Sequence, residues 1–172
     1  MKTSTVRAIN PADYDKLWSR VRPAIRFGQV RDGEYVQRQY QGGARSGYSL
    51  IEARSAGDLS GFGTLRHPRA EADPRLAGLS VAVVSDILFD PAERDVPLAI
   101  LRSAERAAVT LGADALVCSA SHPAVLGSLS ARGYLRIPAT LQFLARLEGA
   151  RETGSLGDWW LLRADGNSDE GF

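Results

Sequence analysis

Apolar and polar positions repeat with two different periods along this chain, and these periods predict strands interleaved with helices. Residues 3–9 alternate between polar and apolar and predict a strand. Asn10 and Pro11 then supply an N-cap and a proline at the first helical position. The helix that they start is expected to end at Pro23, and its apolar stripe consists of Tyr14, Leu17, Trp18 and Val21.

The next part of the chain predicts a helix, a hairpin and a loop. Residues 32–41 carry aromatic and apolar side chains at helical spacing, and two glycines follow them. Residues 48–53 and 59–66 predict two antiparallel strands, because the short segment that joins them has hairpin length and contains Gly57. Residues 67–78 are polar and include two prolines, so they predict a surface loop.

The second half of the chain contains the longest apolar run. Residues 79–89 are almost continuously apolar, which predicts a strand buried on both faces. A helix over 97–111 and a strand over 114–121 follow, and we expect the two strands to be parallel neighbours joined by that helix. The remaining expected elements are a helix over 123–132 and closing strands over 137–147 and 159–163.

Length and charge limit the classes of protein to consider. With 172 residues and 44% hydrophobic content, the chain is expected to form a single domain over residues 1–163, followed by a polar, acidic and flexible tail over 164–172. The formal net charge of +1 disfavours nucleic acid and anionic membranes as partners. No window approaches the roughly 18 apolar residues of a membrane span, and the start lacks an apolar leader, so we expect a cytoplasmic protein.

Residue types that would carry metal or hydrolase chemistry are too few or wrongly spaced. The single Cys118 lies in an apolar run and is interpreted as a small buried hydrophobe. No Cys/His metal spacing, phosphate-binding Walker loop or Gly-x-Ser-x-Gly motif is present. No metal cofactor is therefore expected.

Four short motifs stand in a fixed order along the chain. The apolar strand ends in Asp86-Ile-Leu-Phe-Asp-Pro91, and Arg94 and Ala99 stand at the two ends of the turn that follows. Arg132-Gly133-Tyr134 follows the helix expected over 123–132, and Asp158-Trp-Trp-Leu-Leu-Arg-Ala-Asp165 lies near the end. In order and spacing, these motifs resemble those of the GNAT superfamily of N-acyltransferases, in a divergent bacterial branch, over nearly the whole chain.

The resemblance implies a fold and a cofactor. The fold is an α/β (α+β) architecture with a mixed central sheet of about seven strands flanked by about four helices. The cofactor is acetyl-CoA or another acyl-CoA, whose pantetheine arm would meet the backbone of Leu88 and Phe89. Its pyrophosphate would meet the turn formed by Arg94, Asp95, Val96, Pro97, Leu98 and Ala99.

That turn departs from the family pattern at two positions. Pro97 stands where the family has a glycine, and proline has no N–H to donate to a phosphate. Asp95 places a carboxylate where two phosphates would lie. The local alternative is that Asp95 caps the helix and Pro97 is an ordinary first-turn proline. The loop is accordingly interpreted as a degenerate pyrophosphate site.

Two residues are candidates for proton transfer. Asp86 interrupts the apolar strand, where it could deprotonate an acceptor amine or could be a structural aspartate bonded to backbone or to an arginine. His122 follows the next strand and could act as acid or base, or could simply face water at the start of a helix. Leu129 stands where the family commonly has a tyrosine whose hydroxyl donates a proton to the departing thiolate, and leucine cannot donate a proton.

Two functions remain open at this point. The first is an acyl-CoA-dependent N-acyltransferase that acetylates an amine of a small-molecule or sugar-type acceptor. A homodimer is the assembly considered for this function. The second is a non-catalytic GNAT-fold binding or scaffold module that has lost acyl-CoA binding. Arginines in the expected substrate loops could bind an anionic acceptor group or could be solvated; they are Arg26, Arg31, Arg66, Arg69 and Arg75.

Overall fold

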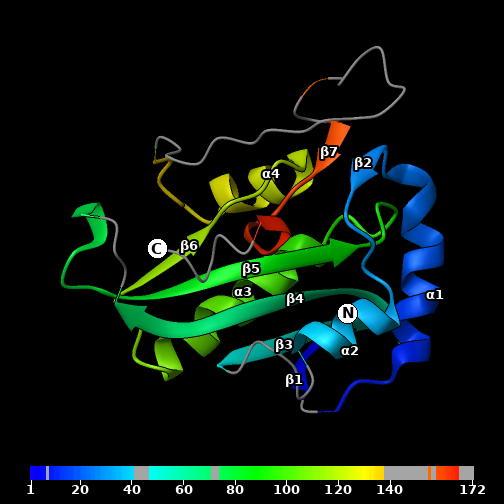
Figure 1. Cartoon of the computed structure of the whole chain (residues 1–172), viewed down its shortest axis with the longest axis horizontal. Helices are drawn as coiled ribbons and strands as arrows, with labels where there is room; N and C mark the ends of the chain where they lie inside the picture. The colour runs from blue at the N-terminus through cyan, green and yellow to red at the C-terminus, as the bar shows by residue number, and fades with distance from the viewer. Residues whose placement is uncertain (7, 41–46, 71–73, 138–154, 156–157, 167–172) are drawn as a thin grey trace.

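The computed structural model describes residues 1–6, 8–40, 47–70, 74–137, 155 and 158–166. Five strands form the central sheet in the order β1-β3-β4-β5-β6, and a separate pair joins β2 to β7 (Figure 1). The central strands are β1 (Lys2–Val6), β3 (Tyr48–Ser55), β4 (Asp58–Ala70), β5 (Ser80–Phe89) and β6 (Ala115–Cys118). The paired short strands are β2 (Phe27–Gly28) and β7 (Trp159–Trp160).

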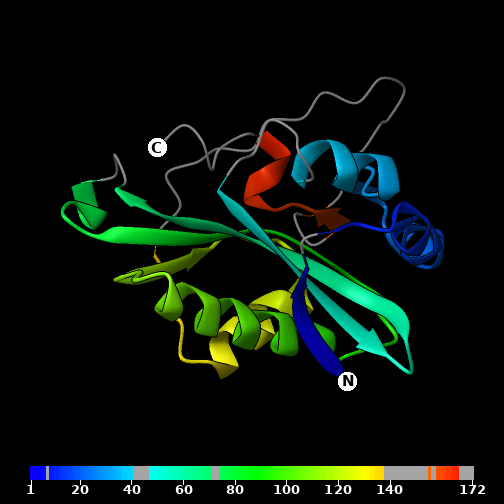
Figure 2. The ribbon, with the colours of Figure 1, turned by 90° about the horizontal axis from the view of Figure 1, so that it is seen from below.

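Helices cover both faces of the central sheet. The helices α1 (Pro11–Val21) and α2 (Gly33–Tyr40) lie on one face, and α3 (Val96–Thr110) and α4 (Pro123–Ala131) lie on the other (Figure 2). Three short 3₁₀ turns complete the described structure: η1 (Arg22–Ala24), η2 (Pro74–Leu76) and η4 (Arg163–Gly166).

The parallel pairing of the two central strands confirms the expectation from sequence. Val81 to Val84 of β5 pair with Ala115 to Cys118 of β6, and α3 connects the strands. β5 pairs antiparallel with β4 on its other side, so the sheet is mixed. All side chains of β5 from Val81 onward are buried, as its apolar run predicted. The pairing with β6 stops at Val84, five residues before β5 ends at Phe89, and this early stop leaves a gap between the two strands.

Two glycines of β4 bring α3 close to the sheet. A Cβ atom added to Gly61 would lie 2.6 Å from Cγ1 of Val96, and one added to Gly63 would lie 2.4 Å from Cγ2 of Ile100. Such distances are far below van der Waals contact, so only glycine fits at either position. The first turns of α3 are therefore held against the carboxyl end of β5.

Several expected boundaries and pairings are wrong. β4 continues to Ala70, into the segment expected to be a loop, because the ladder with β5 is irregular between Arg66 and Arg69 and leaves room there for Pro68. The last strand spans only Trp159–Trp160 and pairs with β2 rather than with the central sheet, which has five described strands instead of about seven. The strand expected over 137–147 lies outside the described residues, except for Ile137.

The assignment of Asp165 to a flexible tail also needs correction. Asp165 belongs to η4, next to Ala164, which is 5% exposed. Its carboxylate is engaged by Arg31 from the segment before α2. The residues from Leu162 to Asp165 therefore pack as part of the domain.

Candidate functional site

A pocket of about 380 Å³ opens between the start of α3 and the face of α4, beyond the carboxyl ends of β5 and β6. This volume lies within the usual range for small-molecule sites, which is about 300–1,000 Å³. The pocket brings together five residues predicted from the sequence, namely Phe89, Arg94, Asp95, Leu98 and His122. The other lining residues are Pro91, Ala124, Gly127, Ser128 and Ala131.

The α4 side of the pocket is made of small residues. Ala124, Gly127, Ser128 and Ala131 recur at helical spacing, so they share one face of the helix. A Cβ atom added to Gly127 would meet nothing within 4 Å, which shows that this face borders open space. The opposite side of α4 anchors it in the core through the buried Val125 and Leu129. Leu129, for which the sequence resemblance implies a tyrosine in related proteins, is thus a core residue.

The N-terminus of α3 offers few backbone donors to an anion. The amides of Val96 and Ala99 already donate to the carbonyl oxygens of Glu93 and Asp95, at 3.0 Å each. Pro97 has no N–H, so two of the four positions 95–98, whose amides usually stay free at the start of a helix, offer no donor to a ligand. Asp95 occupies the N-cap position, but its side chain makes no capping hydrogen bond, which contradicts its expected capping role. Its carboxylate lines the pocket instead.

The predicted cofactor residues divide into lining and supporting positions. Phe89, Arg94, Asp95 and Leu98 line the pocket, whereas Leu88, Val96 and Pro97 are buried in the core. Ala99 is half-buried one turn into α3. The pocket can therefore present one cation, Arg94, and one anion, Asp95, to a ligand.

His122 lies at the inner end of the pocket, at the N-cap of α4. Its Nδ1 accepts a hydrogen bond from the backbone N–H of Ala124 at 3.2 Å. The ring packs against Trp160 with centroids 4.3 Å apart and against the edge of Phe89 at 5.0 Å. Burial lowers the pKa of His122, so the ring is neutral at pH 7 with its proton on Nε2. His122 is half-buried among aromatic rings, in contrast to the expected alternative of a solvated histidine.

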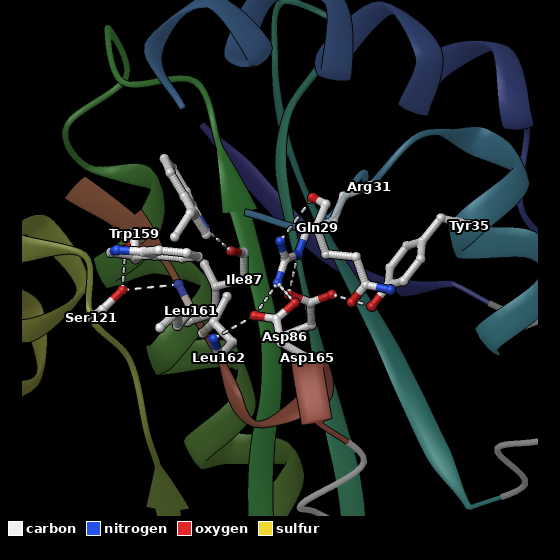
Figure 3. Close-up of polar contacts among 11 residues, drawn as sticks. Gln29, Arg31, Tyr35, Asp86, Ile87, Ser121, Trp159, Leu161, Leu162 and Asp165 are labelled. Carbon is white, nitrogen blue, oxygen red and sulfur yellow. Dashed lines mark hydrogen bonds and ion pairs between the residues drawn. The ribbon is translucent and has the colours of Figure 1, made fainter. Parts of the chain in front are cut away.

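The C-terminal segment fills the gap in which β5 and β6 separate. The indole N–H of Trp160 donates to the carbonyl oxygen of Ile87 at 2.9 Å. On the other side of the gap, the amide of Ser121 donates to the carbonyl oxygen of Leu161, and the amide of Leu161 donates to Oγ of Ser121 (Figure 3). The segment that contains Trp160 therefore bridges the separated strands.

Asp86 lies in a buried cluster of charges on the opposite side of the sheet from α3. Arg31 donates through Nε to Oδ1 of Asp86 at 2.8 Å, and the hydroxyl of Tyr35 donates to Oδ2 at 3.0 Å (Figure 3). Nη2 of Arg31 also donates to both carboxylate oxygens of Asp165, at 2.6 and 2.8 Å. The side chains of Arg31 and Asp86 are fully buried. This arrangement matches the structural alternative for Asp86, an aspartate bonded to an arginine.

The cluster contains two carboxylates for one guanidinium. Burial alone would lower the pKa of Arg31, but Asp86 and Asp165 raise it further above its usual range, so the guanidinium stays charged. Burial raises the pKa of Asp165, and Asp86 adds to this rise while Arg31 opposes it. Burial and the charge of Asp86 likewise raise the pKa of Tyr35, which keeps its hydroxyl protonated as a donor.

Two of the arginines that the sequence assigned to substrate-binding loops are buried and are not available to a ligand there. Arg31 is fully buried in the cluster just described, and Arg66 is 2% exposed within β4 and donates to the carbonyl oxygen of Val81. Sequence reasoning also missed Trp160 and the small-residue face of α4. The helical spacing of Ala124, Gly127 and Ala131 was a usable signal, whereas nothing local to Trp160 indicated its position.

Among the described residues, no group of three or more His, Cys, Asp and Glu side chains could hold a metal ion. In the same part of the chain, no helix is both long and apolar enough to cross a membrane.

Comparison with known proteins identifies the fold. No family model and no curated protein sequence matches the chain. Among solved structures, it is similar to an aminoglycoside N-acetyltransferase in complex with CoA, at 15% identity over 85% of this chain and 100% of that one, with a TM-score of 0.56.

Two further structures show the same likeness. A ribosomal-protein-alanine N-acetyltransferase from Brucella melitensis is 16% identical over 86% of this chain and 100% of that one, with a TM-score of 0.61. An aminoglycoside 6′-N-acetyltransferase from Acinetobacter haemolyticus is also 16% identical over 86% and 100%, with a TM-score of 0.58. The chain therefore has the GNAT fold, as its motifs predicted.

Proposed function

We propose that this protein is an acyl-CoA-dependent N-acyltransferase that transfers an acetyl group to an amine of a small-molecule or sugar-type acceptor. One observation carries the proposal: the pocket between α3 and α4 joins Arg94 and His122 at the carboxyl end of β5. In this fold, structural relatives include an N-acetyltransferase in complex with CoA. Fold alone does not assign activity, so the proposal depends on the residues of this pocket.

The residues of the pocket fit an acyl-CoA, although two of them weaken the fit. Arg94 would contact the pyrophosphate from the side, because the first turn of α3 has little backbone N–H to offer. Asp95 would repel that pyrophosphate. The small residues of α4 leave room for the pantetheine arm beside Phe89. The bound cofactor supplies an acyl group activated as a thioester.

His122 is better placed than Asp86 for proton transfer, because it lines the pocket while Asp86 is fully buried and bonded at both oxygens. When the amine attacks the thioester, the C–N bond would form, the C–S bond would break and CoA would leave as its thiolate. The amine must also lose a proton, and a neutral histidine can accept one near pH 7. Acceptance at Nδ1 would break the hydrogen bond from Ala124, at a cost of about 1 kcal/mol. Asp86 would act by positioning β5 through Arg31.

The second candidate function is a GNAT-fold binding module without catalysis. It is supported by the same first turn of α3, where Pro97 has no N–H and the amide of Val96 is already bonded to Glu93, and by the indole of Trp160 on the edge of β5. Both features would weaken acyl-CoA binding. The amine acceptor and any homodimer belong to the first proposal only.

Calorimetric titration with acetyl-CoA and with CoA separates the two functions. The enzyme proposal predicts saturable binding by the wild type and loss of most of that affinity in Arg94→Ala. Arg102→Ala, which removes an exposed arginine from α3 outside the pocket, is the matched control and should bind as the wild type does. Absence of binding by the wild type, together with no turnover in a screen of amines, would leave the binding module.

A further inference from the structure

The inner end of the pocket is closed by one aromatic side chain that does not itself line it. Trp160 is 3% exposed, and its ring lies 5.0 Å from that of Phe89 and 4.3 Å from that of His122. Phe89 and His122 both line the pocket, so Trp160 forms the layer directly behind them. Its indole N–H fixes the ring to the carbonyl oxygen of Ile87.

The two ends of the pocket differ in polarity. Arg94 and Asp95 lie at the outer end, beside the N-terminus of α3, where an anionic group would be favoured by the helix dipole. The inner end consists of the rings of Phe89 and His122, supported by Trp160. A ligand with a charged end and an apolar end would therefore place the apolar end against these rings.

If the proposed function is right, that apolar end is the acyl group. We propose that Trp160 sets the upper size of the acyl group, so that the pocket accepts acetyl and rejects longer chains. The cause is spatial: the indole occupies the gap between β5 and β6 into which a longer chain would otherwise extend. Protein interiors are close-packed, so a longer chain would require the ring to move.

Trp160 is held in place from its C-terminal side by the buried charge cluster. The amide of Leu162 donates to Oδ2 of Asp165 at 2.7 Å, and Asp165 is bound by Arg31. Arg31 in turn binds Asp86 within β5. The segment from Trp160 to Asp165 is thus fixed to the same strand at two points, and Asp165 is a positioning residue for the indole.

The test is a set of dissociation constants for acetyl-, butyryl- and hexanoyl-CoA, measured by calorimetry. In the wild type, hexanoyl-CoA should bind at least about tenfold more weakly than acetyl-CoA, a difference of about 1.4 kcal/mol. In Trp160→Ala the two constants should come within about threefold of each other. Trp160→Leu, a milder truncation that guards against loss of folding, should bind butyryl-CoA as well as acetyl-CoA.

Trp159→Ala is the matched control, because that neighbouring ring stacks on Phe27 at 4.6 Å and Trp159 is not among the residues that line the pocket. It should keep the wild-type preference for acetyl-CoA. Asp165→Asn should partly reduce the preference for acetyl-CoA over hexanoyl-CoA. A uniform loss of affinity for all three acyl-CoAs would instead indicate that Asp165 has a merely structural role.

The outcomes distinguish this inference from the proposed function. A wild type that binds no acyl-CoA contradicts the proposed function, and the size limit falls with it. A wild type that binds all three equally, or Trp160 variants that keep the wild-type ratio, would overturn the size limit and leave the proposed function standing. A uniform loss of affinity for all chain lengths in both Trp160 variants would also overturn it.

Discussion

The indole N–H of Trp160 donates to the carbonyl oxygen of Ile87 across the gap between two parallel strands, 73 positions away in sequence. The proposed cofactor pocket lies one layer away from this bond, because Phe89 and His122, which line it, both pack against Trp160. The strand edge that a pantetheine arm would use is therefore partly occupied by the protein's own side chain.

Filling the pocket at Gly127 should abolish acyl-CoA binding without harming the fold. A Cβ atom there meets nothing within 4 Å, and leucine favours a helix over glycine by roughly 0.5–1 kcal/mol. Gly127→Leu should therefore unfold at the same or a higher temperature while losing binding in calorimetry. Ser130→Leu, on the same helix but outside the pocket, should retain binding. Retained affinity in Gly127→Leu would show that the ligand lies elsewhere.

Repairing the first turn of α3 should strengthen acyl-CoA binding. Asp95→Asn removes a carboxylate from the pocket, and Pro97→Ala restores one backbone donor. Each change is worth about 1 kcal/mol, so the double variant should bind acetyl-CoA roughly tenfold or more tightly. Glu93→Gln removes a nearby charge that does not line the pocket and should have little effect. Equal tightening by that control would indicate a general charge effect.

Removing the guanidinium from the buried cluster should destabilise the whole domain. Arg31→Met leaves Asp86 and Asp165 close together without a cation, and breaking a buried ion pair in this way costs about 3–5 kcal/mol. Urea unfolding measures the loss. Arg132→Met removes an arginine from an exposed pair with Glu105 and should cause a much smaller loss. Similar losses in both variants would argue against a special role for the buried cluster.

The stability of the protein should fall as the pH is lowered below about 6.5, partly because of His122. Burial lowers the pKa of His122, so the unfolded chain binds a proton in a range where the folded chain does not. The free energy of unfolding therefore rises with pH through that range. His122→Gln should show a weaker pH dependence between about pH 5 and 6.5, measured by urea unfolding. An unchanged slope would contradict the assignment.

The elements around the pocket could be predicted well because their signals are local. The continuous apolar run of β5 and the turn residues around α3 and α4 placed all three within a residue or two of their observed limits. Their order and motifs then indicated the fold. The sequence could assign Phe89, Arg94 and His122 to the pocket because they stand at or next to the ends of these elements.

The long-range contacts could not be predicted in the same way. Arg31 and Asp165 are 134 positions apart, and each lies in a segment whose composition resembles an exposed loop or tail. The sequence indicates that Asp86 is a carboxylate in need of a partner, but it does not indicate that Arg31 is that partner. Pro68 misled the prediction for β4, because the irregular ladder that tolerates it is a property of the assembled sheet.

The separation between Arg31 and Asp165 has a consequence for how the molecule is made. At about 5–20 residues per second, a ribosome adds Asp165 roughly ten seconds after Arg31. Throughout that interval, Arg31 can bind Asp86 but lacks its second partner, Asp165. The carbonyl oxygen of Ile87 likewise lacks the hydrogen bond from Trp160. The domain can therefore complete its folding only after the segment that carries Trp160 and Asp165 has left the ribosome.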